Sequence, residues 1–157
     1  MPAEVGQPAP DFSLPATTGG EVKLSDITKQ GRNVVLFFFP KAFTGTCERQ
    51  VAGHAADYEK FKALDAEVIG ISTDQTPAQA AFAKQCGNDK FPLLSDNRFK
   101  VVMQYGVGKA EGGLPNDRAG FVIDKQGIIR YKFVEPKPGE WSGTQGELDA
   151  LRQIEGK

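Results

Sequence analysis

The 157-residue chain contains few residues that form disulfides or bind transition metals: two cysteines, Cys47 and Cys86, and one histidine, His54. Two widely separated cysteines do not make the framework of a disulfide-rich secreted domain. Without close ligand spacing, these three residues do not supply a zinc site, so we expect no bound metal. In a reducing compartment, two such cysteines are more often catalytic or redox-active than structural.

Long apolar runs and a strong net charge are also missing. No apolar stretch approaches the ~20 residues that span a bilayer, and Met1-Pro2-Ala3-Glu4 has neither the basic start nor the apolar core of a signal peptide. The formal net charge of -1 gives no reason to expect nucleic acid or an acidic membrane surface as a partner. We therefore expect a cytoplasmic protein that binds neither nucleic acid nor membranes.

What the sequence does contain is the composition of an ordinary globular protein, with 39% hydrophobic and 25% charged residues. No internal repeat, low-complexity tract or linker divides it. At this length one compact domain is the default, so we expect residues 1–157 to fold as a single domain.

Strand and helix patterns alternate along the chain. The continuous apolar segment 33–39, rich in Val and Phe, predicts a strand that is buried on both faces. From 45 to 64, apolar residues recur at spacings of three and four, which predicts a helix with a core-facing stripe. Thr76-Pro77 predicts the N-cap and first position of a helix that Gly87 ends. The other expected elements are a hairpin at 11–24, strands at 67–72 and 91–95, a helix capped by Asp96 or Asn97, a hairpin at 121–131 and a last helix around 148–154.

This order of elements predicts an α/β fold with a mixed central β-sheet flanked by helices. It matches the thioredoxin-like architecture, with an N-terminal β-hairpin extension and an addition in the middle.

The segment most suggestive of function ends at Cys47. An apolar strand stops at Pro40, and a loop of small residues then delivers Cys47 to the predicted start of a helix. Unpaired N–H groups and the positive end of the helix dipole stabilise an anion there, so the position suits a reactive thiolate. A free cysteine is commonly a buried small hydrophobe, but other residues supply the apolar face of this helix.

Pro40, Thr44 and Cys47 reproduce the proline–three–threonine–two–cysteine motif of the peroxiredoxins, thiol peroxidases built on a thioredoxin-like fold. The chain resembles this family over nearly its whole length. Further similar segments follow in the same order at 91–96, 105–107 and 118–124. The chain is similar above all to the Q-type (bacterioferritin-comigratory) and E-type branches.

The resemblance implies a role for several residues. Cys47 is the nucleophile that attacks the peroxide and becomes a sulfenic acid. The Thr44 hydroxyl hydrogen-bonds the thiolate and the bound peroxide, and Pro40 shields the cysteine by closing the loop over it. Arg118, just before a predicted strand, is the cation that stabilises the thiolate and donates to peroxide oxygens. The backbone N–H groups of Thr46 and Cys47 are expected to complete the anion-binding pocket.

One position departs from the pattern of many relatives, which carry glutamate three residues after the nucleophile. Here that residue is Gln50, which accepts a hydrogen bond but brings no charge. The hold on Arg118 is therefore expected to be weaker, or to come from another carboxylate. For His54 we expect a surface or helix-packing role in preference to a general base, because an ionised thiol needs none.

The fate of the oxidised sulfur depends on Cys86, at the end of the helix that carries a resolving cysteine in some Q-type members. There, the Cys47 sulfenic acid would condense with Cys86 into an intramolecular disulfide. Alignment places the cysteine of those members near Phe82, about one turn earlier, and the position used by other members is Ala52 here. A one-cysteine enzyme that an external thiol resolves therefore stays open.

Together these features predict a thiol peroxidase that reduces hydrogen peroxide and small organic hydroperoxides without a cofactor. A thioredoxin- or glutaredoxin-like donor would recycle it, and a monomer or homodimer fits the resemblance. A thiol–disulfide oxidoreductase is disfavoured because a Cys-x-x-Cys pair ending at Cys47 requires a cysteine where Thr44 stands. A peroxide sensor that signals through sulfenylated Cys47 stays open.

Overall fold

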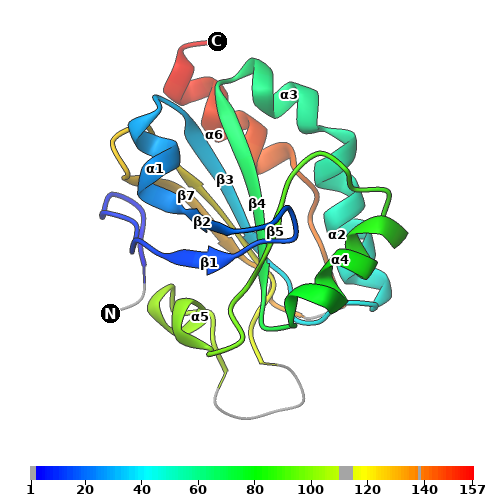
Figure 1. Cartoon of the computed structure of the whole chain (residues 1–157). Helices are drawn as coiled ribbons and strands as arrows, with labels where there is room; N and C mark the ends of the chain where they lie inside the picture. Colours follow the sequence, from blue (N-terminus) through cyan, green and yellow to red (C-terminus); the bar gives the residue numbers. More distant parts are fainter. Residues whose placement is uncertain (1–2, 110–114, 138) are drawn as a thin grey trace.

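The computed structural model describes residues 3–109, 115–137 and 139–157. A central sheet has helices on both of its faces (Figure 1). The elements are β1 (Ser13–Pro15), β2 (Glu21–Lys23), α1 (Leu24–Lys29), β3 (Asn33–Phe38), α2 (Gly45–Ala56), α3 (Tyr58–Ala63), β4 (Ala66–Ser72), α4 (Thr76–Gln85), β5 (Leu93–Ser95), α5 (Lys100–Gln104), β6 (Ala119–Ile123), β7 (Ile129–Val134) and α6 (Gln145–Glu155).

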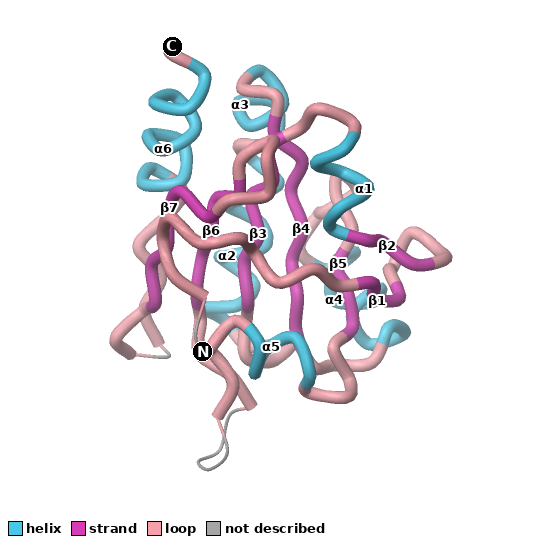
Figure 2. The backbone as a smooth tube through the Cα atoms, turned by 90° about the vertical axis from the view of Figure 1, so that its left-hand side faces the viewer, coloured by secondary structure: helices cyan, strands magenta, loops and turns pink. Residues whose placement is uncertain are grey.

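The central sheet has five strands in the order β5-β4-β3-β6-β7. Strands β3, β4 and β5 run parallel, whereas β6 pairs antiparallel with both β3 and β7. Figure 2 faces this sheet, with the small antiparallel β1–β2 hairpin in front of one edge. The expected mixed sheet and the expected N-terminal hairpin are thus both confirmed.

Strand β3 lies at the centre of two hydrophobic cores, one on each face of the sheet. Its alternate side chains Leu36 and Phe38 pack in the core that includes residues of α1 and α5. Phe37 points the other way, into a core with residues of α2, α3, α4 and α6. Every residue of β3 is buried, which confirms the strand predicted to be buried on both faces.

The helix expected over 45–64 is two helices. Asp57 separates α2 from α3 and adopts φ -98 and ψ 9. Its carboxylate accepts a hydrogen bond from the Thr144 hydroxyl at 2.5 Å. Aspartate favours turns over helix interiors because its side chain competes for local hydrogen bonds. The apolar stripe continues across the break, since Phe61 and Leu64 are buried. The spacing of apolar residues therefore gave no sign that one helix ends and another begins at Asp57.

The starts of the shorter helices also differ from the sequence-based expectation. The N-cap of α4 is Gln75 instead of Thr76, so Pro77 occupies the second helical position. The short helix α1 was not predicted, because its six residues carry too little pattern to separate it from a loop. The N-cap of α5 is Phe99, so neither Asp96 nor Asn97 holds that position. The Asp96 carboxylate nevertheless accepts hydrogen bonds from the backbone N–H groups of Lys100 and Val102 at the start of this helix.

The contact between β3 and β4 leaves no room for a side chain at Gly70. A Cβ there would lie 2.7 Å from the ring of Phe37 and 2.8 Å from Leu93. We expect Gly70→Ala to lower the free energy of unfolding by about 1–3 kcal/mol, the usual cost of overpacking a core. Gly139→Ala is the matched control, because nothing lies within 4 Å of a Cβ at that position. Urea unfolding measures both, and equal midpoints for the two variants would contradict this packing.

Candidate active site

Cys47 is the third residue of α2 and is 1% exposed. The first turn of a helix leaves backbone N–H groups without acceptors inside the helix, here those of Gly45, Thr46 and Cys47. These groups and the helix dipole favour negative charge at the sulfur. Strand β3 directs the chain to this point, because it ends just before the loop that enters α2.

The loop between β3 and α2 is held in an unusual conformation. Phe43 has a positive φ of 66, which is rare for a residue with a side chain. Its ring packs against Phe82, with the two ring centroids 5.4 Å apart. Asp74, just after β4, accepts hydrogen bonds from the Ala42 N–H and the Ser72 hydroxyl, both at 2.8 Å. The Asp74 carboxylate thus binds the loop that leads to Cys47.

Arg118 reaches Cys47 from the strand on the other side of β3. Its Nη1 lies 3.1 Å from the Cys47 Sγ and 2.8 Å from the Gln50 Oε1, and the residue is only 3% exposed. The pairing of Phe38 with Ala119 explains this placement, because it sets Arg118 beside the end of β3. A buried guanidinium donates a charge-assisted hydrogen bond that stabilises a thiolate.

Gln50 is fixed at both ends of its amide. Its Nε2 donates to the Phe38 carbonyl at 3.2 Å while its Oε1 accepts from Arg118. Gln50, which occupies the position of the glutamate that orients the arginine in many relatives, therefore contacts Arg118 through a neutral amide oxygen. The amide orientation is set by these two partners.

Thr44 and Pro40 also lie at this loop. Pro40 is buried, whereas Thr44 is half-buried and forms the N-cap of α2. The Thr44 hydroxyl donates to the Lys41 carbonyl at 3.1 Å. The expected hydrogen bond from Thr44 to Cys47 is not formed in this structure, although the hydroxyl oxygen keeps its capacity to accept.

Cys86 ends α4 and packs, half-buried, against the same hydrophobic core as Cys47. Gln85 Nε2 donates to Glu48 Oε2 at 3.3 Å, so the end of α4 touches the first turn of α2. Both cysteines are free. Burial, then the charges of Glu48 and Cys47, raise the pKa of the Cys86 thiol to about 12.

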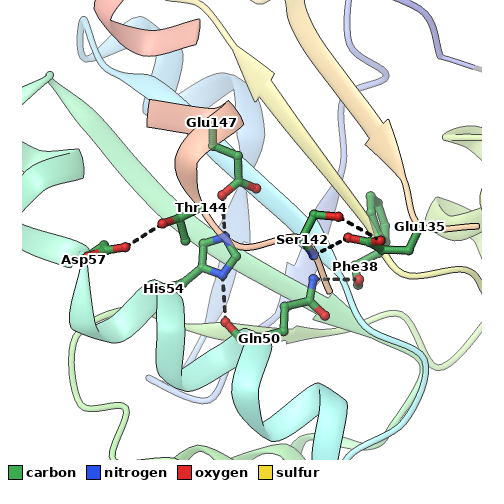
Figure 3. A network of polar contacts seen from close by, with 8 residues as sticks. All are labelled: Phe38, Gln50, His54, Asp57, Glu135, Ser142, Thr144 and Glu147. Atoms are coloured by element: carbon green, nitrogen blue, oxygen red, sulfur yellow. Dashed lines mark hydrogen bonds and ion pairs between the residues drawn. The ribbon is translucent and has the colours of Figure 1, made fainter. Parts of the chain in front are cut away.

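A buried polar network behind the site was not anticipated from the sequence (Figure 3). His54 is 0% exposed, with Nδ1 2.8 Å from the Gln50 carbonyl oxygen and Nε2 2.7 Å from Glu147 Oε1. Burial lowers the pKa of the ring, but the Glu147 charge and the hydrogen bonds to Glu147 and Gln50 outweigh it, and the net pKa is raised. The expected helix-packing role fits this position, whereas a surface location is wrong. A glutamate 93 positions away gives no local signal by which the pair could have been found.

The described residues 3–109, 115–137 and 139–157 contain no group of three or more His, Cys, Asp or Glu side chains that could hold a metal ion. Within the same ranges, each helix is too short or too polar to cross a membrane.

Comparison with known proteins agrees with this geometry. The profile of the AhpC/TSA family matches residues 5–132. Peroxiredoxin Bcp of Escherichia coli is 38% identical over 140 residues, which cover 84% of this chain and 86% of that protein. The chloroplastic peroxiredoxin Q of Triticum aestivum is 39% identical over 82% of this chain and 58% of its own length. The crystal structure of peroxidoxin BcpB from Mycobacterium tuberculosis superposes with a TM-score of 0.87 at 32% identity, covering 97% of this chain and 98% of that one.

The raised pKa of Cys86 has a direct consequence for its chemistry. Because the thiolate is the reactive form, we expect Cys86 in the folded protein to be alkylated at least about a hundredfold more slowly near pH 8 than in urea. The folded-state rate should keep rising with pH toward the pKa of about 12. Peptide mass spectrometry after a timed iodoacetamide pulse measures this rate. Equal rates in the folded and urea-unfolded protein would show that the surroundings of Cys86 do not suppress its ionisation.

Proposed function

The chain belongs to the AhpC/TSA family of peroxiredoxins and is a thiol-dependent peroxidase, and we propose that Cys47 is its peroxide-reducing nucleophile. The observation that carries the proposal is the 3.1 Å contact between the buried Arg118 Nη1 and the Cys47 Sγ at a helix N-terminus. Two independent sources of positive charge, a guanidinium and a helix end, meet at one sulfur. This combination suits a thiolate nucleophile in place of a structural thiol.

The reaction is a two-electron displacement on oxygen. The Cys47 thiolate attacks one peroxide oxygen, an S–O bond forms and the O–O bond breaks. The second oxygen leaves with the bonding electron pair and takes up a proton, which yields an alcohol or, from hydrogen peroxide, water. Cys47 becomes a sulfenic acid, the first step of cysteine oxidation.

The surrounding groups stabilise the charge that moves onto the leaving oxygen. Arg118 and the N–H groups of Thr46 and Cys47 point toward the same end of α2 and act as donors. Thr44 would accept from the peroxide or donate to it after its hydroxyl turns away from Lys41. Buried Pro40 limits the access of water and larger oxidants to the sulfur.

For the second half of the cycle we favour Cys86 as the resolving thiol. It packs against the core that holds Cys47, and the Glu48–Gln85 hydrogen bond ties the two helix ends together. Its raised pKa means that the thiol is protonated in the closed structure, so resolution requires the end of α4 to open and expose it. Attack of its sulfur on the sulfenic acid forms the disulfide and releases water. The competing scheme is attack by an external thiol.

The reductant, the location and the oligomeric state complete the proposal. A disulfide between Cys47 and Cys86 would be reduced by a thioredoxin- or glutaredoxin-like dithiol, which also fits a cytoplasmic location. The protein would act as a monomer or homodimer without metal, organic cofactor, nucleic acid or membrane. The alternative of a peroxide sensor uses the same sulfenic acid, but transmits it to a partner instead of turning over.

Stopped-flow measurement of peroxide consumption tests the proposed nucleophile. Cys47→Ser should abolish the reaction. Arg118→Gln should slow it by about 10²–10³-fold, the usual cost of removing one donor to a developing anion. The control is Arg130→Gln, which removes a surface arginine that pairs with Asp124 far from Cys47 in sequence, and it should react at the wild-type rate. Oxidation of the wild-type protein no faster than a free thiol would refute the proposal and favour a sensor or binding role.

Intact mass after one equivalent of peroxide distinguishes the two ways of resolving the sulfenic acid. A loss of ~2 Da would show a disulfide, whereas a gain of ~16 Da would show a sulfenic acid that persists. We expect the loss in the wild-type protein and the gain in Cys86→Ser. If Cys86→Ser still loses ~2 Da, or the wild-type gains ~16 Da, Cys86 is not the resolving residue.

A further inference from the structure

Both ring nitrogens of His54 have polar partners (Figure 3). Its two nitrogens lie 2.8 Å from the Gln50 carbonyl oxygen and 2.7 Å from Glu147 Oε1. Its face stacks on Phe37, with ring centroids 4.1 Å apart and an interplanar angle of 11°. A buried histidine held in this way does more than fill space, since each nitrogen has a defined partner.

The two partners determine how many protons the pair holds. A carbonyl oxygen can only accept, so Nδ1 carries a hydrogen. The short contact between Nε2 and Glu147 requires a second proton, on either the ring or the carboxyl group. The pair is therefore an imidazolium with a carboxylate or a neutral imidazole with a carboxylic acid. Its net charge is zero in both cases.

The sequence leaves space for this pair at glycine positions. A Cβ at Gly120 would lie 2.6 Å from Glu147 Oε2, and a Cβ at Gly53 would collide with the Trp141 ring, whose centroid is 5.8 Å from that of His54. A side chain at either glycine would displace a member of the network. Both close approaches therefore depend on glycine.

The Glu147 side chain also lies close to Arg118. Gly120, over which its carboxylate lies, is two residues after Arg118 on β6. Arg118, Gln50 and Glu147 also line one small cavity of about 20 Å³, room for about one water molecule. An ionised Glu147 without its histidine would thus be a buried anion next to the guanidinium. A carboxylate is a stronger partner for a guanidinium than a neutral amide.

We propose that His54 is a positioning residue: its contact neutralises Glu147, so that the charge of Arg118 is directed at Cys47 and not shared with a buried carboxylate. Neutral Gln50 fits the same arrangement, because it orients Arg118 without opposing its charge. The inference rests on the proposed role of Cys47 and extends it to residues that do not touch the peroxide.

Other charged groups near His54 have partners of their own. Asp57 at the end of α2 accepts from the Thr144 hydroxyl and pairs with Lys60 at 3.4 Å. Glu135 accepts from the backbone N–H and the hydroxyl of Ser142. Tyr131 on β7, whose hydroxyl lies against Gly146, and Arg118 just before β6 line the same cavity as Glu147. Among the described residues, Glu147 is the carboxylate that contacts the ring.

The test compares pH profiles of Cys47 alkylation in three variants, read by peptide mass spectrometry, and their rates of peroxide reduction. His54→Phe keeps a flat ring on Phe37 but leaves Glu147 without a proton-bearing partner. We expect its alkylation midpoint to rise by about one pH unit and its peroxide reduction below that midpoint to slow about tenfold. The double variant His54→Phe/Glu147→Gln should return within about 0.3 unit of the wild-type midpoint. Asp57→Asn, which removes a carboxylate that does not contact the ring, is the matched control and should not move the midpoint.

The double variant separates charge neutralisation from packing. If it shifts as far as His54→Phe, or if His54→Phe does not shift, the role of His54 is only structural and the proposal is wrong. The proposed function stands or falls separately, on peroxide oxidation of the wild-type protein and of Cys47→Ser. The midpoint differences between the charge variants bear on His54 alone.

If His54→Phe does not fold, the wild-type protein still decides the matter. Nitrogen-15 shifts of the His54 ring and the carbon-13 shift of the Glu147 carboxyl count the protons on the pair at each pH. The proposal requires the pair to keep its second proton throughout the range in which Cys47 ionises. Release of that proton before Cys47 ionises overturns it.

Discussion

The contact between Arg118 and Cys47 is the interaction on which the rest of the site depends. A thiolate is costly to bury unless a positive charge and hydrogen bonds meet it. The fold supplies them from two directions, the first turn of α2 and the residue just before β6, which meet because α2 follows the end of β3 and β6 begins beside that end. The central strand is therefore more than part of the core: its length and its register with β6 place the guanidinium at the sulfur.

The same constraint explains why the polar groups behind the site are arranged as they are. Two of the described groups near the guanidinium have different roles: one orients it, and the other must be prevented from neutralising it. Gln50 does the first with an uncharged oxygen. Glu147 is charged in its usual form, and it lies in a buried contact with the one histidine of the chain. Without its histidine, an ionised Glu147 would compete with the thiolate for the arginine.

The two cysteines sit in environments that suit different steps of one cycle. Cys47 is buried on a helix start, and the Asp74 carboxylate binds the loop that precedes this helix. Cys86 lies at a helix end, half-buried, where burial and nearby negative charge keep its thiol protonated. Helix ends open more readily than helix interiors. The first cysteine is thus ready in the closed structure, whereas the second becomes reactive only when α4 loosens.

Local sequence pattern by itself determined the strands, most of the helices and the position of Cys47 on a helix start, because hydrophobic periodicity and turn residues act over a few positions. The motif at Pro40, Thr44 and Cys47, and its resemblance to the peroxiredoxins, pointed to the family that the comparisons show. Local pattern failed at Asp57, where a hydrogen bond from Thr144 breaks the helix without disturbing its apolar stripe. Only the tertiary structure decided that Thr44 bonds to Lys41, that Gln50 bridges Phe38 and Arg118, and that His54 pairs with Glu147. The longer-range contacts among them join residues far apart in the chain, and buried polar groups find such partners only when the strands and helices that carry them have packed.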